Sequence, residues 1–155
     1  MKKTICLLLA AILVLSLAAC GAGNTNKAEN GKQTASAYLN QSEDAVVEVT
    51  VDLSGGWSVE FVRGAVYLYD GEITAGKESV AMLITLDQEV YEEDLAKAMA
   101  DGSHKEADSG IYFTGDGNQA AYLTALNDSA YILITSTNKE DIETIVSRFS
   151  LAIDQ

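Results

Sequence analysis

The sequence predicts an α+β domain built on a mainly antiparallel β-sheet with two amphipathic helices. Apolar and polar residues alternate in short runs from residue 45 onward, which is typical of half-buried strands. Glycine- and asparagine-rich turns separate several of these runs. Two other stretches carry apolar residues at helical spacing, and they do not alternate regularly with the strands. This order favours an α+β arrangement.

The first two strands are expected to form a β-hairpin. Apolar and polar residues alternate over residues 45–53 and again over residues 57–61. The intervening Ser54-Gly55-Gly56 has the composition of a tight turn.

The remaining strands follow the same pattern. They are predicted over residues 65–69, 80–86, 111–114, 120–126 and 131–135. Residues 80–86 (VAMLITL) are apolar on both faces, so this strand is expected in the middle of the sheet.

Two helices interrupt the strands. Asp87 is the expected N-cap of the first helix, which ends at Asp101-Gly102 and has one apolar face: Tyr91, Leu95, Ala98 and Met99. Thr137–Glu140 fits a capping box before the second helix, whose apolar face is Ile142, Ile145, Val146 and Phe149.

The order of these elements resembles the Mog1/PsbP-like fold. The resemblance starts at Gly56–Phe61 (GWSVEF) and covers residues 45–153, with a helix after a central strand, a β-meander and a C-terminal amphipathic helix. It implies an α/β/α sandwich. Because members of this group are mostly non-catalytic binders or assembly factors, it also favours a binding role, although fold analogy does not establish function.

The N-terminus reads as a secretory signal. Met1-Lys2-Lys3 is followed by an uncharged apolar run over residues 4–17 and then by Leu17-Ala18-Ala19-Cys20. The run is shorter than the roughly 20 apolar residues of a transmembrane helix, the alternative interpretation. The last four residues resemble the lipobox of bacterial lipoproteins. The resemblance implies cleavage before Cys20 and a thioether link from its sulfur to diacylglycerol.

Three segments are therefore predicted. Residues 1–19 form the signal peptide, residues 20–44 the lipidated cysteine and a flexible tether, and residues 45–155 a single α+β domain. The segment 21–44 is rich in Gly, Asn, Ser and Gln, and such a composition buries too little apolar surface to order the chain. For Tyr38-Leu39 alone in this segment, docking onto the domain is an alternative. Cys6 would leave with the signal, so the mature domain would have no disulfide.

The chain is strongly acidic, which limits its partners. It carries 23 Asp and Glu against 10 Lys and Arg, a net charge of −13. Removal of the signal would take away Lys2 and Lys3. A surface of this sign is repelled by nucleic-acid phosphates and by anionic lipid headgroups. Nucleic acid is therefore not expected as a partner, and the expected membrane contact is the lipid anchor alone.

Catalytic and metal-binding patterns are weak. His104 is the only histidine. Ser103 is adjacent to it in sequence, but adjacency does not place the serine hydroxyl against the imidazole ring, as a catalytic triad requires. An exposed loop histidine is therefore expected. Zinc sites built from cysteine and histidine are excluded for the mature chain. Asp116-Gly117-Asn118 begins like a calcium loop, but Ala120 stands where an oxygen ligand belongs. A hairpin turn is favoured there, and weak calcium binding remains open.

Tyrosines are the best candidates for a binding surface. Tyr67 and Tyr69 share one face of a predicted strand, and Tyr112 and Tyr122 lie on later strands. If both helices cover one face of the sheet, the other face would display these rings, which suit sugars or peptides. The alternative is that the rings close the core.

The expected function is non-catalytic. The sequence favours a lipid-anchored protein of the cell membrane or outer membrane, facing away from the cytoplasm, whose acidic domain binds an extracellular ligand or an envelope protein. An envelope structural or assembly factor is the first alternative. The second is a hydrolase that uses a carboxylate pair such as Asp101 and Asp108.

Overall fold

The computed structural model of the chain describes residues 25–29, 32–42, 45–115, 117, 119–137 and 141–154. These residues form two β-sheets and two helices, and all of their strand pairings are antiparallel. The predicted α+β class, with mainly antiparallel strands and two helices, is confirmed.

The smaller sheet combines strands from both ends of the described chain. Its order is β1 (Thr25–Glu29), β2 (Lys32–Ser42), β3 (Ala45–Asp52) and β11 (Phe149–Asp154). The valines of β3 fall on one face because side chains alternate along a strand. Val47, Val49 and Val51 are fully buried there, so this face carries the core.

The larger sheet contains seven strands. Its order is β4 (Trp57–Val62), β5 (Ala65–Asp70), β6 (Ala81–Leu86), β10 (Ala130–Ser136), β9 (Ala120–Asn127), β8 (Gly110–Thr114) and β7 (Lys105–Ala107). β6 has a neighbour on both sides, as its uninterrupted apolar run predicted.

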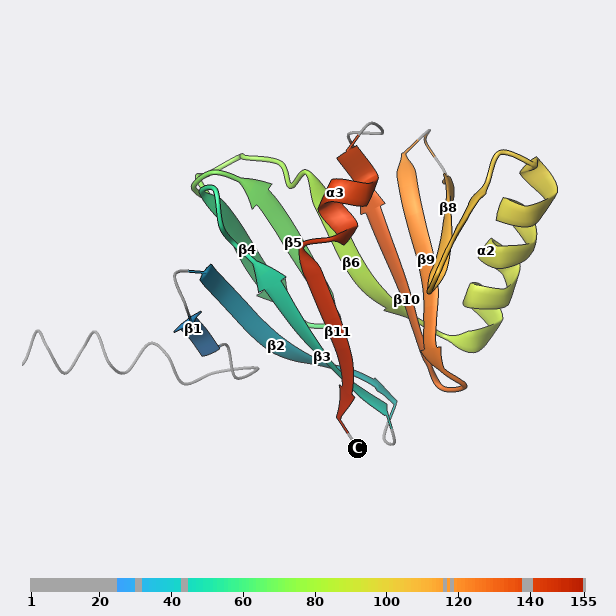
Figure 1. Cartoon of the computed structure of the whole chain (residues 1–155), viewed down its shortest axis with the longest axis horizontal. Coiled ribbons are helices and arrows are strands. Elements are labelled where there is room, and N and C mark those ends of the chain that lie inside the picture. Colours follow the sequence, from blue (N-terminus) through green and yellow to red (C-terminus); the bar gives the residue numbers. More distant parts are fainter. Residues whose placement is uncertain are drawn as a thin grey trace, which may run out of the picture.

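The two faces of the seven-stranded sheet pack against different elements. Ile132 and Ile134 of β10 belong to the main core with the valines of β3, and we call this side the inner face. Tyr131 and Leu133 belong to a second cluster with residues of helix α2 (Gln88–Asp101), and we call this side the outer face. The four-stranded sheet lies in front of the larger sheet in Figure 1, and α2 lies at one end.

The two helices lie on opposite faces of the larger sheet. Helix α2 follows Asp87, ends at Gly102 in the left-handed conformation, and packs on the outer face through Tyr91 and Leu95. Helix α3 (Ile142–Val146) packs on the inner face beside the four-stranded sheet. The condition under which the tyrosines would share an open face, with both helices on the other face, is therefore not met. The layer order also departs from an α/β/α sandwich, because a second sheet covers most of the inner face.

The helices of the described residues are too short or too polar to cross a lipid bilayer.

The predicted hairpin between β3 and β4 is wrong, because the two strands belong to different sheets. Gly55 and Gly56 have φ angles of 85° and 88° and carry the chain from one sheet to the other. Arg148 fixes this crossover from the far end of the chain. Its Nη1 donates to the carbonyl oxygens of Asp52 and Ser54 at 3.1 and 3.0 Å, and its guanidinium lies 4.4 Å from the centre of the Trp57 ring.

The predicted flexible tether is wrong for residues 25–29 and 32–42. These residues form β1 and β2, which pair with each other, and β2 also pairs with β3 along its length. Ala35, Ala37 and Leu39 alternate on one face and are buried against the core. Small residues suffice there because β2 covers a layer that already contains the large side chains of β3 and the opposite sheet.

The predicted C-terminal helix is shorter than expected. Helix α3 ends at Val146, and Phe149 begins β11 instead of completing an apolar helical face. Asp141, not Thr137, precedes the helix; the rest of the expected capping box, residues 138–140, lies outside the described residues. The alternation of Phe149, Leu151 and Ile153 matches a strand that packs on the core, and this pattern prevails.

Candidate functional site

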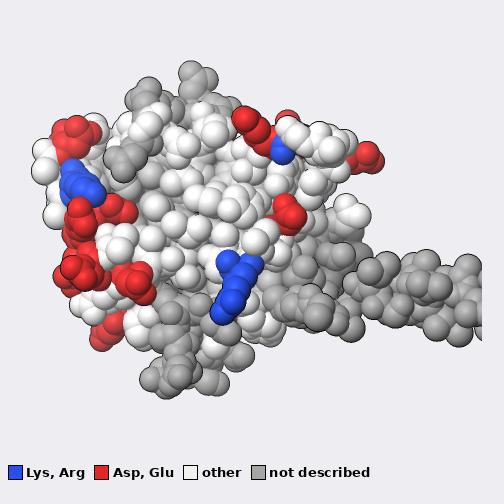
Figure 2. Space-filling view, turned by 180° about the vertical axis from the view of Figure 1, so that it is seen from behind, with Lys and Arg blue, Asp and Glu red and all other residues white. Residues whose placement is uncertain are grey.

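The outer face of the larger sheet is only partly covered. Helix α2 is a polar helix that packs over β8, β9 and β10 through a few side chains, and its only buried residue is Ala98. Figure 2 views the molecule from behind and shows a broad uncharged surface beside the acidic residues of this helix. A groove lies along the boundary between the helix and the open part of the sheet.

The floor of this groove is apolar. It consists of Phe113 of β8, Ala121 of β9 and Leu133 of β10. Strand register brings them together. Phe113 pairs with Ala121, and Ala121 pairs with Thr135 of β10. Leu133 lies two residues before Thr135, on the same face of β10. The groove has a volume of about 220 Å³.

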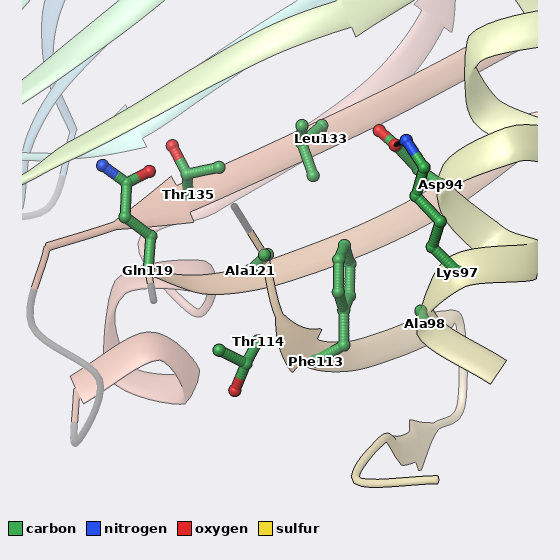
Figure 3. Close-up of a pocket in the computed structure, with 10 residues that line it drawn as sticks. Asp94, Lys97, Ala98, Phe113, Thr114, Gln119, Ala121, Leu133 and Thr135 are labelled. Atoms are coloured by element: carbon green, nitrogen blue, oxygen red, sulfur yellow. Dashed lines mark ion pairs between the residues drawn. The ribbon is translucent and has the colours of Figure 1, made fainter. Parts of the chain in front are cut away.

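The rim of the groove is polar. Asp94 and Lys97 of α2 stand on one side, and Gln119 and Thr135 stand at the opposite end (Figure 3). Lys97 is held by Glu93 at 3.0 Å and by Asp94 at 3.6 Å, so its charge is balanced within the helix. The groove thus combines an apolar floor with amide, hydroxyl and compensated charged groups around it.

A second hollow continues the groove toward β5. It has a volume of about 150 Å³ and shares Gln119 and Thr135 with the first. Tyr67 and Met82 form its far side, and both belong to the outer face because Tyr67 pairs with Met82 and Met82 pairs with Thr135. The two hollows give a continuous strip across the outer face from α2 to Tyr67.

The structure places the predicted tyrosines in different environments. Tyr67 lines the second hollow, whereas Tyr69, on the same face, is only 8% exposed. Its hydroxyl donates to Glu60 Oε2 at 3.1 Å. Burial raises the pKa of Tyr69, and the hydrogen bond to Glu60 raises it further. Of this pair, Tyr67 alone lines the second hollow.

Tyr112 and Tyr122 lie on the inner face, away from Tyr67. Their ring centres are 4.7 Å apart, and the Tyr122 hydroxyl is 2.8 Å from Ser109 Oγ. Burial raises the pKa of Tyr112, and the neighbouring Tyr122 adds to the rise. The four predicted tyrosines therefore do not form one surface. Their strands were placed correctly, but sequence spacing does not reveal which faces of different strands coincide.

The weak catalytic candidates are not brought together with the groove. Ser103 Oγ donates to the Asp101 carboxylate, and His104 Nδ1 is buried without a hydrogen-bond partner among the described residues. Asp101 and Asp108 are both exposed, and neither lines the grooves described above.

Metal and lipid predictions fall largely outside the described part of the chain. Asp116 and Asn118 of the calcium-like turn lie outside it, as does Cys20. Within the described residues, no three His, Cys, Asp or Glu side chains form a group suited to a metal ion.

Sequence reasoning missed the groove residues Phe113, Gln119, Leu133 and Thr135. The strands that carry Phe113, Leu133 and Thr135 were predicted, whereas Gln119 precedes β9. Alternation places Leu133 and Thr135 on one face of β10. The missing information was the register with β8 and β9, together with the limited extent of α2. Both depend on tertiary packing.

No protein-family model, curated protein or solved structure matches this chain.

Proposed function

We propose that this chain is a non-catalytic, lipid-anchored protein of the cell envelope, and that its domain binds a small uncharged ligand in the outer-face groove. The ligand class is a sugar or a short neutral peptide. The observation that supports this proposal is the combination of an apolar floor and a rim of amide and hydroxyl groups. Such a combination is typical of small-molecule sites, where polar groups fix the orientation of a ligand that is otherwise held by apolar contact.

The chemistry of the groove favours ligands with one apolar face. A sugar ring can pack its C–H groups on Phe113 and Leu133 while its hydroxyls reach Gln119 and Thr135. A side-chain amide both donates and accepts hydrogen bonds, so it suits a hydroxyl group that does the same.

Charge favours neutral over anionic ligands. Glu93 and Asp94 stand next to Lys97 on α2, and the whole chain has a net charge of −13. A phosphorylated or carboxylated ligand would enter a negative potential, whereas a neutral one would not. This argument separates the proposed ligands from their anionic derivatives.

A ligand screen tests the proposal. The soluble form containing residues 21–155 keeps every described residue. It would be screened by thermal shift and calorimetry against neutral mono- and disaccharides, neutral di- and tripeptides, and the matching sugar phosphates. We expect stabilisation by at least one neutral compound and none by its phosphate. Stabilisation by the phosphates alone, or by no compound, would contradict the proposed ligand class.

Matched variants then locate the site. Thr135→Val removes a hydroxyl at nearly constant volume, and Gln119→Ala removes the amide. Loss of one neutral hydrogen bond costs about 0.5–1.5 kcal/mol, so each variant should weaken binding roughly two- to tenfold. Gln33→Ala on β2 is the control, because Gln33 is also exposed but lies in the other sheet. Unchanged binding in both groove variants would place the ligand elsewhere.

A further inference from the structure

We infer that the free edge of β11, with the cleft beside it, binds an extended peptide segment of a partner protein as a fifth strand of the four-stranded sheet. This site lies on the inner side of the larger sheet. It is separate from the outer-face groove, and it does not depend on the ligand proposed there.

Backbone hydrogen bonding shows which groups of β11 face the open side. At the end of β3, the Asp52 N–H donates to the Arg148 carbonyl at 2.8 Å. The N–H of the next residue, Leu53, donates at 2.8 Å to the Gln33 carbonyl of β2, on the opposite side of β3. Bonding in an antiparallel sheet alternates in this way along each strand. Asp52 and Arg148 are a hydrogen-bonded pair, so every second pair along the two strands is hydrogen-bonded as well. These pairs are Thr50 with Ser150 and Glu48 with Ala152, and Ser150 and Ala152 therefore direct their backbone groups toward β3.

The intervening residues of β11 direct their backbone groups away from β3. Phe149, Leu151 and Ile153 therefore present three N–H donors and three carbonyl acceptors on the open side, at intervals of about 7 Å. Among the described residues, β11 has no strand partner other than β3. A row of this kind is a template for a further strand.

A cleft lies directly beside this edge. Its volume is about 430 Å³, and it is lined by Phe149, Ser150 and Leu151 of β11 together with residues of β9, β10 and α3. In Figure 1, β8 and β9 extend past β11 without a strand of the smaller sheet in front of them. The cleft exists because a four-stranded sheet covers a seven-stranded one, and a single added strand would extend that cover.

The floor of the cleft indicates the side chains that would fit. Leu126 and Val146 supply apolar surface, and three hydroxyl-bearing residues add polar groups: Ser109, Tyr122 and Thr124. All three hydroxyl groups are already engaged, since Thr124 Oγ1 donates to the Ser109 carbonyl and the Tyr122 hydroxyl is hydrogen-bonded to Ser109 Oγ. Alternate residues of the added strand that face this floor should therefore be mainly apolar.

A second copy of this chain fits the edge poorly. Antiparallel pairing of two β11 strands would relate the copies by a twofold axis perpendicular to the sheet. Both larger sheets would then lie on the same side, where each extends past its own β11 (Figure 1), and they would collide. Two chains of net charge −13 would also repel each other. The occupant is therefore a single extended segment, uncharged or basic, from a different protein.

A peptide library tests the inference. A random heptapeptide phage library would be panned on the form containing residues 21–155, and enriched peptides would be synthesised and titrated. We expect peptides with alternating apolar residues and few acidic ones. Their binding should slow amide hydrogen exchange at Phe149, Leu151 and Ile153, measured by NMR, while Ser150 and Ala152 are slow already. Failure to enrich any peptide, or protection confined to other strands, would overturn the inference.

Matched variants separate this site from the outer groove. Ser109→Trp places an indole in the cleft and should weaken peptide binding at least tenfold, whereas Ser129→Trp, in the turn between β9 and β10, should not. Leu151→Pro removes one open-side donor and Leu151→Val retains it, which gives a second test if the first variant unfolds. Gln119→Ala should leave peptide binding unchanged. Sedimentation that shows a dimer abolished by Leu151→Pro would instead assign the edge to a second copy.

Discussion

The absence of a side chain at Gly110 allows β8 to approach Tyr122 closely. A Cβ atom at this position would lie 2.3 Å from the Leu123 carbonyl oxygen and 2.9 Å from both Cζ and the hydroxyl of Tyr122. The carbonyl belongs to the paired strand β9 and cannot move without disturbing the sheet. Glycine is therefore required here by space, although its backbone conformation is ordinary.

We predict that Gly110→Ala lowers the free energy of unfolding by about 1–3 kcal/mol, the usual cost of forcing extra atoms into a packed site. Urea unfolding measures it. Gly115→Ala is the matched control, because its new Cβ would meet Ala121 at an ordinary 3.5 Å. Equal effects of the two substitutions would contradict the steric explanation.

Tyr69 makes a prediction about alkaline stability. Its pKa is raised by burial and by the hydrogen bond to Glu60. Because the folded-state pKa lies above the unfolded value of about 10, the stabilisation is complete below pH 10 and is lost as the pH rises through the folded-state pKa. Tyr69→Phe cannot ionise, so its unfolding free energy should fall less steeply above pH 10 than that of the unmodified protein.

Urea unfolding between pH 8 and pH 11 tests this slope. Tyr38→Phe provides the control, since Tyr38 is 46% exposed. Near neutral pH, Tyr69→Phe should cost about 1 kcal/mol through the lost hydrogen bond. Parallel pH profiles for Tyr69→Phe and the unmodified protein would disprove the role of this hydroxyl.

At the scale of elements, Arg148 joins the two sheets. It donates to two carbonyls of the crossover between β3 and β4 and stacks on Trp57. Arg148→Ala should lower the unfolding free energy by about 1–3 kcal/mol, because the half-buried Asp52 carbonyl and the exposed Ser54 carbonyl lose a charged donor and Trp57 loses the stacked guanidinium. Arg63→Ala, in the exposed turn between β4 and β5, should change it by less than about 0.5 kcal/mol. Calorimetric melting compares the two variants.

Strand β2 makes the second prediction at this scale. A form beginning at residue 45 would lack the three buried side chains of β2 and would expose the hydrogen-bonding edge of β3. We expect it to melt at a much lower temperature than the form beginning at residue 21, or to aggregate. Equal melting temperatures would restore the boundary at residue 45 that the sequence indicates.

Local pattern predicted helix α2 and six of the seven strands of the larger sheet, because each has a clear pattern of apolar residues; the short strand β7 was not predicted. Local pattern failed where the structure depends on which strands pair with each other. The glycines after β3 are compatible with either a hairpin or a crossover, and only the packing of Arg148 and Trp57 distinguishes them. β2 is poor in large apolar residues, so its composition resembles that of a tether. The groove was missed for a related reason, since its floor comes from three strands whose register is not encoded locally.

At the scale of the whole molecule, the position of β1 limits the proposed tether. If Cys20 carries the lipid, only residues 21–24 separate it from the start of β1 at Thr25. Four residues span at most about 14 Å, whereas the 24-residue coil expected from composition would span roughly 25–30 Å. An anchored domain would therefore remain close to the headgroups, where its net negative charge, increased by the loss of Lys2 and Lys3 with the signal, disfavours contact with anionic lipids.

The proposed lipid anchor gives the last prediction. Two acyl chains on one cysteine suffice for stable membrane attachment, where a single chain gives only marginal binding. Cys20→Ala should abolish metabolic labelling with a fatty acid, because it removes the sulfur that would carry the diacylglycerol. Cys6→Ala is the matched control, because Cys6 lies within the apolar run of the proposed signal and its loss should leave the labelling unchanged. Labelling of Cys20→Ala equal to that of the unmodified protein would contradict lipidation of this cysteine, and the lipid anchor would have to be abandoned.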